Sequence, residues 1–191
     1  MRIIAGAWRG RVLQAPAGAA TRPTADRVRQ ALFDMLLHAP WGGRDLLAGA
    51  HVLDVFAGTG ALGLEALSRG AAFATLIEQD RAALAALRAN ITRLDAGGRC
   101  AVLATSALAT PTRTASDGAP ATLVFLDPPY GGELVPRALH HLAAQGWITA
   151  GALVVAETAR GEPPPHTEPL AERMHGATRV SFWRDGPSRG L

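Results

Sequence analysis

The segment DVFAGTGALG, residues 54–63, carries a carboxylate followed by three glycines, and both features concern the binding of a cofactor. Gly58, Gly60 and Gly63 form the pattern G-x-G-x-x-G, which is typical of the turn between a strand and a helix that holds a dinucleotide. Glu78 follows Gly58 by 20 residues, the spacing at which an acidic side chain accepts hydrogen bonds from ribose hydroxyls. These residues are compatible with NAD and with S-adenosylmethionine.

Asp54 separates these two cofactors. A carboxylate beside a diphosphate would face strong electrostatic repulsion in a site of low effective dielectric. Beside the ammonium group of a methionyl chain, the same carboxylate is attractive. Asp54 therefore favours S-adenosylmethionine. Cys100 is the only cysteine, which excludes an internal disulfide and a metal site built from cysteines.

The segment FLDPPY, residues 125–130, indicates what the cofactor reacts with. The two prolines after Asp127 remove two N–H donors, so neighbouring carbonyl groups are left to act as acceptors. The exocyclic amine of a nucleobase is a poor nucleophile because its lone pair is conjugated with the ring. Hydrogen bonds to Asp127 and to the carbonyl of Pro128 would favour a tetrahedral nitrogen and stabilise its developing positive charge. Tyr130 can stack on a base that has been flipped out of its helix.

The rest of the sequence predicts an α/β fold that brings these residues together. Strands are expected at 51–56, 74–78, 100–104, 121–126 and 152–157, and helices at 24–37, 61–69, 81–94 and 133–145. This alternation predicts a parallel sheet covered on both faces. Residues 170–176 and 178–184 are expected to add an antiparallel pair, and residues 109–121 to form a surface loop. Ligands bind at the carboxyl ends of such strands, where Asp54, Glu78 and Asp127 are expected.

Both ends of the chain are basic. Residues 1–30 carry six arginines against one aspartate, a net charge of +5, and residues 173–191 carry four against one, a net charge of +3. Trp8 and Trp183 lie among these arginines. Arginine interleaved with aromatic residues suits phosphate contacts and base stacking. The alternative is that both ends are solvated and poorly ordered.

The organisation of the chain is expected to be simple. Residues 1–20 predict a small basic β-hairpin, and residues 21–191 a single Rossmann-like domain. There is no apolar run of about 18 residues, so we expect no membrane span. The first residues contain no long apolar stretch typical of a secretion signal. We expect a cytoplasmic monomer.

Together these motifs resemble the RsmD family of class I, S-adenosylmethionine-dependent methyltransferases, which methylate N2 of a guanine in bacterial 16S rRNA. The resemblance extends from about Arg2 to Arg184. It rests on the segments RIIAGAWRGR, RPTADRVRQALFD, DVFAGTGALGLEALSRGA, IEQD and LDPPY. His175 and Ala177 depart from the family pattern, which has an aromatic residue and aspartate there.

The resemblance implies a Rossmann-like class I methyltransferase fold with a mostly parallel seven-stranded sheet and a small N-terminal hairpin. It implies S-adenosylmethionine as cofactor, no metal, and as substrate a guanine of the guanine-966 type in 16S rRNA, either free or in an assembling small subunit. Three sets of residues follow from it. The cofactor set is Asp54, Phe56, Ala57, Gly58, Thr59, Gly60, Glu78, Gln79 and Ser106. The catalytic set is Asp127, Pro128, Pro129 and Tyr130. The RNA-binding set is Arg2, Trp8, Arg9, Arg11, Arg22, Arg27 and Arg29.

Three other functions were weighed against this one. An adenine-N6 DNA methyltransferase shares D-P-P-Y but needs a target-recognition domain, for which 191 residues leave no room. A catalytically idle RNA-binding protein on the same fold would not need the glycines or D-P-P-Y. A nicotinamide oxidoreductase is opposed by Asp54 and lacks an evident proton donor.

Overall fold

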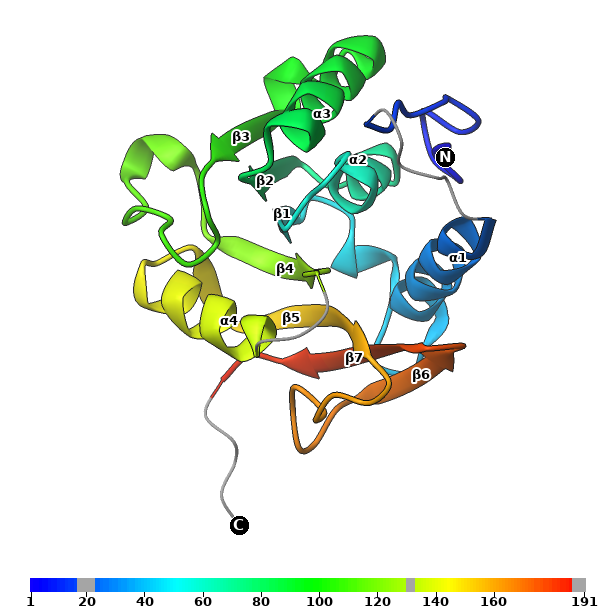
Figure 1. Cartoon of the computed structure of the whole chain (residues 1–191), viewed down its shortest axis with the longest axis vertical. Coiled ribbons are helices and arrows are strands. Elements are labelled where there is room, and N and C mark those ends of the chain that lie inside the picture. Colours follow the sequence, from blue (N-terminus) through cyan, green and yellow to red (C-terminus); the bar gives the residue numbers. More distant parts are fainter. Residues whose placement is uncertain (17–22, 130–132, 187–191) are drawn as a thin grey trace.

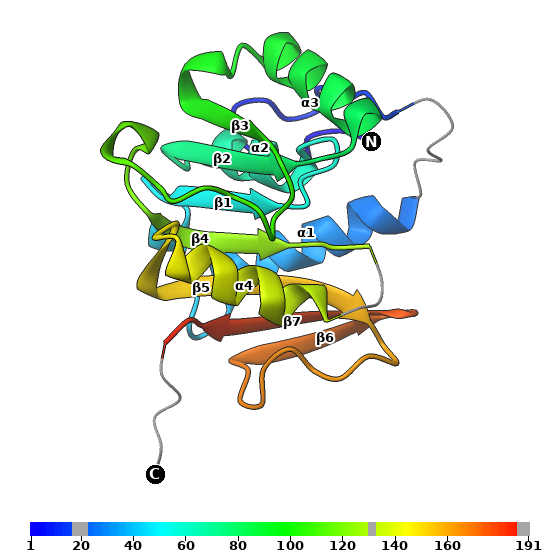
Figure 2. The same ribbon diagram turned by 60° about the vertical axis from the view of Figure 1, so that its left-hand side comes forward.

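The protein is built around one twisted sheet with helices on both faces (Figures 1 and 2). The computed structural model describes residues 1–16, 23–129 and 133–186. Its helices are α1 (Pro23–His38), α2 (Ala61–Ser68), α3 (Arg81–Leu94) and α4 (Leu134–Ala144), and its strands are β1 (His51–Val55), β2 (Phe73–Glu78), β3 (Cys100–Ala104), β4 (Ala121–Leu126), β5 (Ile148–Ala159), β6 (Ala171–His175) and β7 (Thr178–Arg184). The 3₁₀ turns are η1 (Arg44–Leu46), η2 (Gly97–Arg99) and η3 (Ala115–Asp117).

The seven strands are arranged in the order β3-β2-β1-β4-β5-β7-β6. The first five strands are parallel, whereas β7 pairs antiparallel with both β5 and β6. The strand order reverses between β1 and β4, and Asp54 on β1 lies opposite Leu76 on β2 and Phe125 on β4. A switch of this kind opens a crevice at the carboxyl ends of the strands.

Two separate hydrophobic cores hold the helices on the sheet. Helices α1, α2 and α3 pack against one face, where Val52 and Phe125 contribute buried side chains. Helix α4 covers the other face, where Leu53 and Val55 are buried. Successive strand residues face opposite sides of a sheet, so Asp54, between Leu53 and Val55, belongs to the face that carries α1 and α2.

The predicted architecture is confirmed, with two differences in detail. Strand β5 is longer than expected, and its pairing with β4 is irregular between Ala121 and Leu123. Residues 109–121 form the expected loop, but it contains the short turn η3. In the described parts of the chain, no helix is long and apolar enough to cross a membrane.

The N-terminal segment, residues 1–16, forms the predicted β-hairpin in a short form. Its two arms are joined by one antiparallel bridge, between Arg2 and Val12, and by backbone hydrogen bonds of Ile3 with Gly10 and Arg11 and of Leu13 with Met1. The hairpin also packs on the domain, because Ile3 and Leu13 are buried in the core beside α1 and α2. The segment is therefore packed against the domain, in contrast to the solvated end that was the alternative expectation.

Glu65 of α2 is the main polar anchor of this segment. Its side chain is fully buried, and its carboxylate accepts hydrogen bonds from the backbone N–H of Ile4 at 2.7 Å and of Ala5 at 3.0 Å. Arg69 donates its Nε–H to the same carboxylate at 2.7 Å, and Arg29 Nε lies 3.9 Å away. Buried charges require such pairing because their desolvation is costly.

We expect Glu65→Ala to lower the free energy of unfolding by about 3–5 kcal/mol, because it leaves Arg69 and Arg29 buried without their carboxylate. Urea denaturation followed by circular dichroism measures this change. The matched control is Asp34→Ala, which removes an exposed partner of Gln30 and should cost under about 0.5 kcal/mol. A loss below about 1 kcal/mol for Glu65→Ala would show that Glu65 does not anchor the segment.

Candidate cofactor and nucleic-acid site

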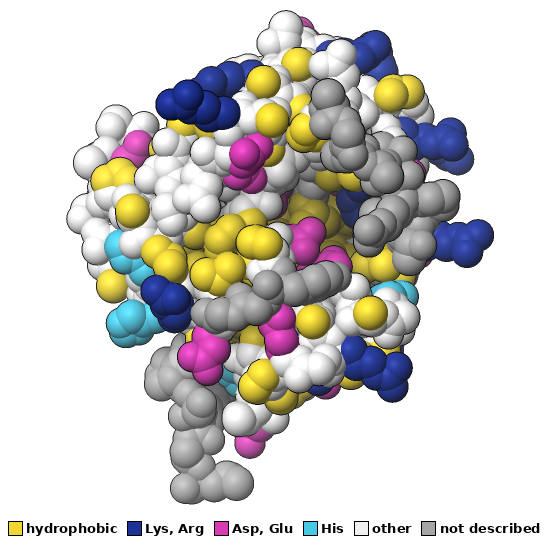
Figure 3. Space-filling model, in the orientation of Figure 1, with side chains coloured by type: hydrophobic (Ala, Val, Ile, Leu, Met, Phe, Trp, Pro, Cys, Tyr) yellow, Lys and Arg dark blue, Asp and Glu magenta, His cyan; other side chains and the backbone are white. Residues whose placement is uncertain are grey.

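Three carboxylates lie at the carboxyl ends of three adjacent strands. Asp54 is in β1, Glu78 ends β2, and Asp127 follows β4. Their negative charges are close enough for Asp127 and Glu78 to influence the titration of Asp54. Figure 3 shows this face hollowed near the carboxyl end of β4, with acidic side chains at the edge of the hollow. The structure thus brings together the three acidic residues that the sequence predicted at one site.

Asp54 is the most buried of the three, with 1% of its surface exposed. Burial raises the pKa of Asp54 to about 8, the hydrogen bond from the Gly63 N–H opposes this shift, and the neighbouring charges of Asp127 and Glu78 add to it. That hydrogen bond joins Gly63 N to Asp54 Oδ2 at 2.8 Å. A carboxyl group in this condition gains from any cation that enters beside it, because the cation favours the ionised form.

The glycines of the loop after β1 have distinct steric roles. Gly60 has a φ of +80°, and a Cβ atom there would lie 2.4 Å from Leu87 Cδ1 of α3. A Cβ atom at Gly63 would lie 3.0 Å from Asp54 Oδ2, a tighter contact than most side chains make, so glycine eases the close approach of α2 to the carboxylate. Gly58 has a φ of +56° with open space around it, so its requirement is conformational.

Phe56, at the start of the same loop, also has a positive φ of 64°. A bulky side chain rarely adopts this left-handed conformation. Such strained residues are concentrated at ligand sites, where the surrounding structure enforces the conformation. Ala57 donates its N–H to the Ile77 carbonyl of β2 at 2.9 Å, and the Ala57 carbonyl accepts the N–H of Gly60 at 2.7 Å. The loop is therefore closely held against β2.

Glu78 supports the loop from the end of β2. Its Oε2 accepts the N–H of Gly58 at 2.8 Å, and its Oε1 accepts those of Gln79 at 2.7 Å and Asp80 at 2.8 Å. A carboxylate has about four acceptor positions, so Glu78 keeps one on Oε2 for a ligand hydroxyl. Half-buried and fixed by three donors, Glu78 is both a support for the glycine loop and a candidate ribose ligand.

Ser106 lies one strand further along the same edge. Strand β3 ends at Ala104, which pairs with Glu78, and Ser106 follows two residues later. Its Oγ accepts the Leu108 N–H at 3.2 Å, and its carbonyl accepts the Ala109 N–H. Ser106 is therefore held in a turn beside the ribose candidate, where the adenine region was expected.

The D-P-P segment continues β4 at the same edge. Asp127 donates its N–H to the Val55 carbonyl at 3.4 Å, which keeps it beside β1. Desolvation by the surrounding protein raises the pKa of Asp127 to about 6, although part of its side chain stays open to solvent. Pro128 is buried and Pro129 is exposed. Tyr130 lies outside the described residues.

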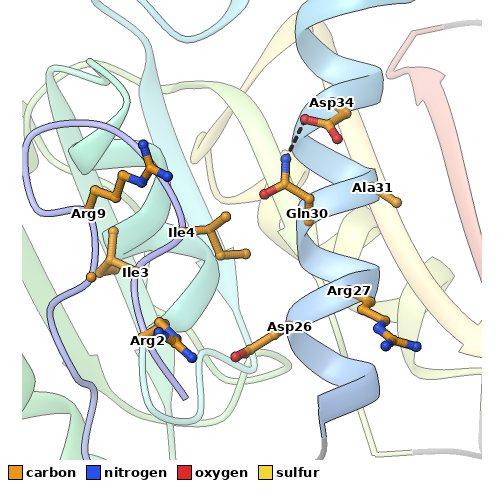
Figure 4. Close-up of a pocket in the computed structure, with 10 residues that line it drawn as sticks. Arg2, Ile3, Ile4, Arg9, Asp26, Arg27, Gln30, Ala31 and Asp34 are labelled. Atoms are coloured by element: carbon orange, nitrogen blue, oxygen red, sulfur yellow. Dashed lines mark hydrogen bonds between the residues drawn. The ribbon is translucent and has the colours of Figure 1, made fainter.

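The predicted RNA-binding residues are divided by the structure. Arg2, Arg9, Arg11 and Arg27 are exposed, and Arg2, Arg9 and Arg27 line a groove of about 520 Å³ between the N-terminal segment and α1. Figure 4 shows Arg2 and Arg9 on the N-terminal segment, across the groove from the Gln30–Asp34 pair of α1. Arg22 lies outside the described residues.

The surroundings of Arg29 and Trp8 differ from those expected for residues that contact RNA. Arg29 is 5% exposed, donates to the Arg2 carbonyl at 2.6 Å and pairs with Asp26 at 3.0 Å. Its charge is used inside the protein, so the prediction that it contacts RNA is wrong. Trp8 is half-buried, and the guanidinium group of Arg99 lies 5.4 Å from its ring centroid. One face of this ring is therefore already covered.

Sequence reasoning missed one buried polar residue beside the site, Asn90 of α3. Its side-chain amide donates to the Thr59 carbonyl in the glycine loop and is fully buried. The sequence signal for Asn90 is its helical spacing from Leu87 and Leu94. Both are core residues of α3, so this spacing places Asn90 on the buried face of the helix. Within residues 1–16, 23–129 and 133–186, no group of three or more His, Cys, Asp or Glu side chains could hold a metal ion.

The chain is similar to proteins of one family along nearly its whole length. Residues 1–184 match the family model described as "Conserved hypothetical protein 95". The chain is 44% identical over 158 residues to Ribosomal RNA small subunit methyltransferase D of Escherichia coli (strain K12), covering 83% of this chain and 74% of that protein. It is 34% identical over 188 residues to the protein of the same name from Haemophilus influenzae, covering 97% and 94%.

The solved structure of a putative methyltransferase from Escherichia coli superposes on this one with a TM-score of 0.80. The two chains are 38% identical, and the match covers 98% of this chain and 99% of the other. The predicted methyltransferase fold is thereby confirmed. The chain belongs to the Conserved hypothetical protein 95 family, which is the RsmD family that its motifs resemble.

Proposed function

We propose that the protein is an S-adenosylmethionine-dependent methyltransferase that modifies the N2 amine of a guanine in small-subunit ribosomal RNA. Its family and the names of its relatives support a methyltransferase of small-subunit rRNA. The finer assignment, to guanine N2 and to one position of the guanine-966 type, is part of the proposal. The observation that supports the proposal is that Asp54 and Asp127 lie close together where the strand order reverses, between β1 and β4.

The carboxylates select the charge of the cofactor. Asp127 and Glu78 make the carboxyl edge of the sheet acidic, and Asp54 ionises when a cation lies beside it. The edge therefore favours a ligand that carries ammonium and sulfonium groups over a diphosphate. Asp54 would hold the ammonium group of the methionyl chain. Glu78 would accept a ribose hydroxyl on Oε2, and Ser106 would lie at the adenine. When bound, the cofactor supplies an electrophilic methyl group.

The D-P-P segment then positions the amine that accepts the methyl group. The Asp127 carboxylate and the carbonyl of Pro128 would accept the two N–H groups, which directs the nitrogen lone pair toward the methyl group. The nitrogen would gain a bond to the methyl carbon as the cofactor gives up its carbon–sulfur bond, and the amine proton could pass to water. Asp127 would stabilise the positive charge that develops on nitrogen, and no covalent enzyme intermediate is needed.

The exposed arginines of the N-terminal segment supply the contact with RNA. Arg2 and Arg9 line the groove beside α1, and Arg11 is exposed on the same segment. Their guanidinium groups suit phosphate oxygens. The groove would therefore provide a path for part of the RNA backbone between the N-terminal segment and α1.

The direct test is methylation of small-subunit rRNA with a cofactor labelled in its methyl group. Digestion to nucleosides and mass spectrometry should give N2-methylguanosine. Label in N6-methyladenosine would instead support the adenine-N6 alternative. The absence of any label, with RNA and cofactor both bound, would support an idle RNA-binding protein.

We expect Asp127→Ala to slow methyl transfer by about 10²–10³, the usual cost of removing one group that stabilises a transition state. Asp127→Asn should retain more activity than Asp127→Ala, because its amide oxygen still accepts a hydrogen bond. Single-turnover rates at saturating cofactor measure both, and cofactor affinity should change little. Equal loss in the two variants would contradict the acceptor role and indicate that Asp127 removes a proton.

We expect cofactor affinity to rise with pH between about 6 and 8. Without ligand, the pKa of Asp54 is about 8, so the group is largely protonated at pH 7. An ammonium group lowers this pKa in the complex, so binding must release a proton. Calorimetric titration of S-adenosylhomocysteine at pH 7 in buffers of different ionisation enthalpy measures that release. Asp54→Asn should bind more weakly and lose the pH dependence, and an unchanged pH dependence would place the ammonium group elsewhere.

We expect the double change Arg9→Ala and Arg11→Ala to weaken RNA binding and to reduce its salt dependence. Each phosphate contact contributes roughly 0.7 to the slope of log K against log salt for single strands, so the slope should fall by up to about 1.4. The control is Arg44→Ala, an exposed arginine of η1. Wild-type affinity of the double variant at every salt concentration would show that these arginines are only solvated.

A further inference from the structure

Asn90 is a fully buried asparagine on the core side of α3. A buried amide is costly unless its donors and acceptors are paired, and Asn90 is fully paired on its donor side. Its Oδ1 accepts the Gln14 N–H at 2.7 Å, and its Nδ2 donates to the Gln14 carbonyl at 3.0 Å and to the Thr59 carbonyl at 3.0 Å. One side chain of α3 therefore joins two distant parts of the chain.

The first of these parts is the N-terminal segment. The amide of Asn90 pairs with both backbone groups of Gln14, in the way that a neighbouring strand would. Arg9 and Arg11, which we assign to RNA, precede Gln14 by five and three residues. Asn90 thus fixes the end of the segment that carries these arginines, whereas Glu65 and Ser68 of α2 fix its beginning.

The second part is the glycine loop. Thr59 lies between Gly58 and Gly60, whose positive φ values define the loop. The loop also touches the N-terminal segment directly, because Thr59 Oγ1 lies 3.6 Å from Met1 Sδ. Leu87, one helical turn before Asn90, lies against Gly60. The same face of α3 therefore supports the loop that would hold the cofactor and the segment that would hold RNA.

We propose that Asn90 is a positioning residue that couples cofactor binding at the glycine loop to RNA binding by the N-terminal segment. This inference rests on the proposed function. A cofactor that fixes Thr59 also fixes the amide of Asn90, and a fixed amide holds Gln14 and the arginines before it in the geometry that RNA requires. Coupling between two binding sites is reciprocal, so RNA must raise cofactor affinity by the same factor.

The experiment measures the coupling factor, which is the ratio of RNA affinities with and without saturating S-adenosylhomocysteine. Fluorescence anisotropy with labelled small-subunit rRNA, at constant salt, gives both affinities. We expect a factor of at least about 5 for the wild-type protein, at the lower end of typical coupling between sites. Calorimetric titration of S-adenosylhomocysteine with and without the RNA should return the same factor.

Two variants and a matched control assign the coupling to Asn90. Asn90→Leu keeps the size of the side chain and removes all three hydrogen bonds. Asn90→Asp retains the acceptor for Gln14 N–H but places oxygen against the carbonyl groups of Gln14 and Thr59. The control is Ser68→Ala, because Ser68 anchors the same segment through Trp8 N–H and the Ala5 carbonyl. Among the described residues, its side chain makes no hydrogen bond to the glycine loop.

Both Asn90 variants should show a coupling factor close to 1. Ser68→Ala should weaken RNA binding with and without cofactor, and keep a factor within about twofold of wild type. A coupling factor of 1 for the wild-type protein would overturn the inference without any variant. A folded Asn90 variant that keeps the coupling factor of the wild-type protein would overturn it as well. Failure of the protein to bind rRNA at all would instead overturn the proposed function, so the two failures are distinct.

Discussion

The site depends on one constraint: Asp54 is a carboxyl group held almost without solvent at the point where the strand order reverses. The hydrogen bond that its carboxyl group accepts from the Gly63 N–H at 2.8 Å does not offset the loss of water, and its pKa is raised to about 8. The position is costly unless a cation completes it. The glycine at position 63 and the close approach of α2 to β1 hold this carboxyl group in place.

Helix α2 connects Asp54 with the N-terminal segment at the surface. Near its beginning, Gly63 holds Asp54, and two residues later Glu65 holds the N-terminal segment through the N–H groups of Ile4 and Ala5. Eight residues of helix therefore connect the proposed cofactor site with the proposed RNA surface. Asn90 makes a second connection between them from α3. The protein uses buried polar side chains, rather than an additional domain, to place its basic segment.

The sequence was sufficient for the features that depend on local pattern. Strand and helix periodicity predicted the sheet, and the positions of Asp54, Glu78 and Asp127 after apolar runs predicted that they meet at one edge. The parts that it could not predict depend on partners far away in the chain. Arg29 looked like one more basic side chain near the N-terminus, but one of its two acidic partners, Glu65, lies 36 residues later. The N-terminal hairpin was predicted from local pattern, but the buried contacts of Ile3 and Leu13 with the domain were not.

The central claim is that this edge of the sheet binds a cationic methionyl cofactor and not a diphosphate. Parallel calorimetric titrations of the protein with S-adenosylhomocysteine and with NAD test it most directly, because both ligands carry an adenosine but differ in charge beside Asp54. We expect saturable binding of S-adenosylhomocysteine and much weaker or undetectable binding of NAD. Tighter binding of NAD than of S-adenosylhomocysteine would contradict it.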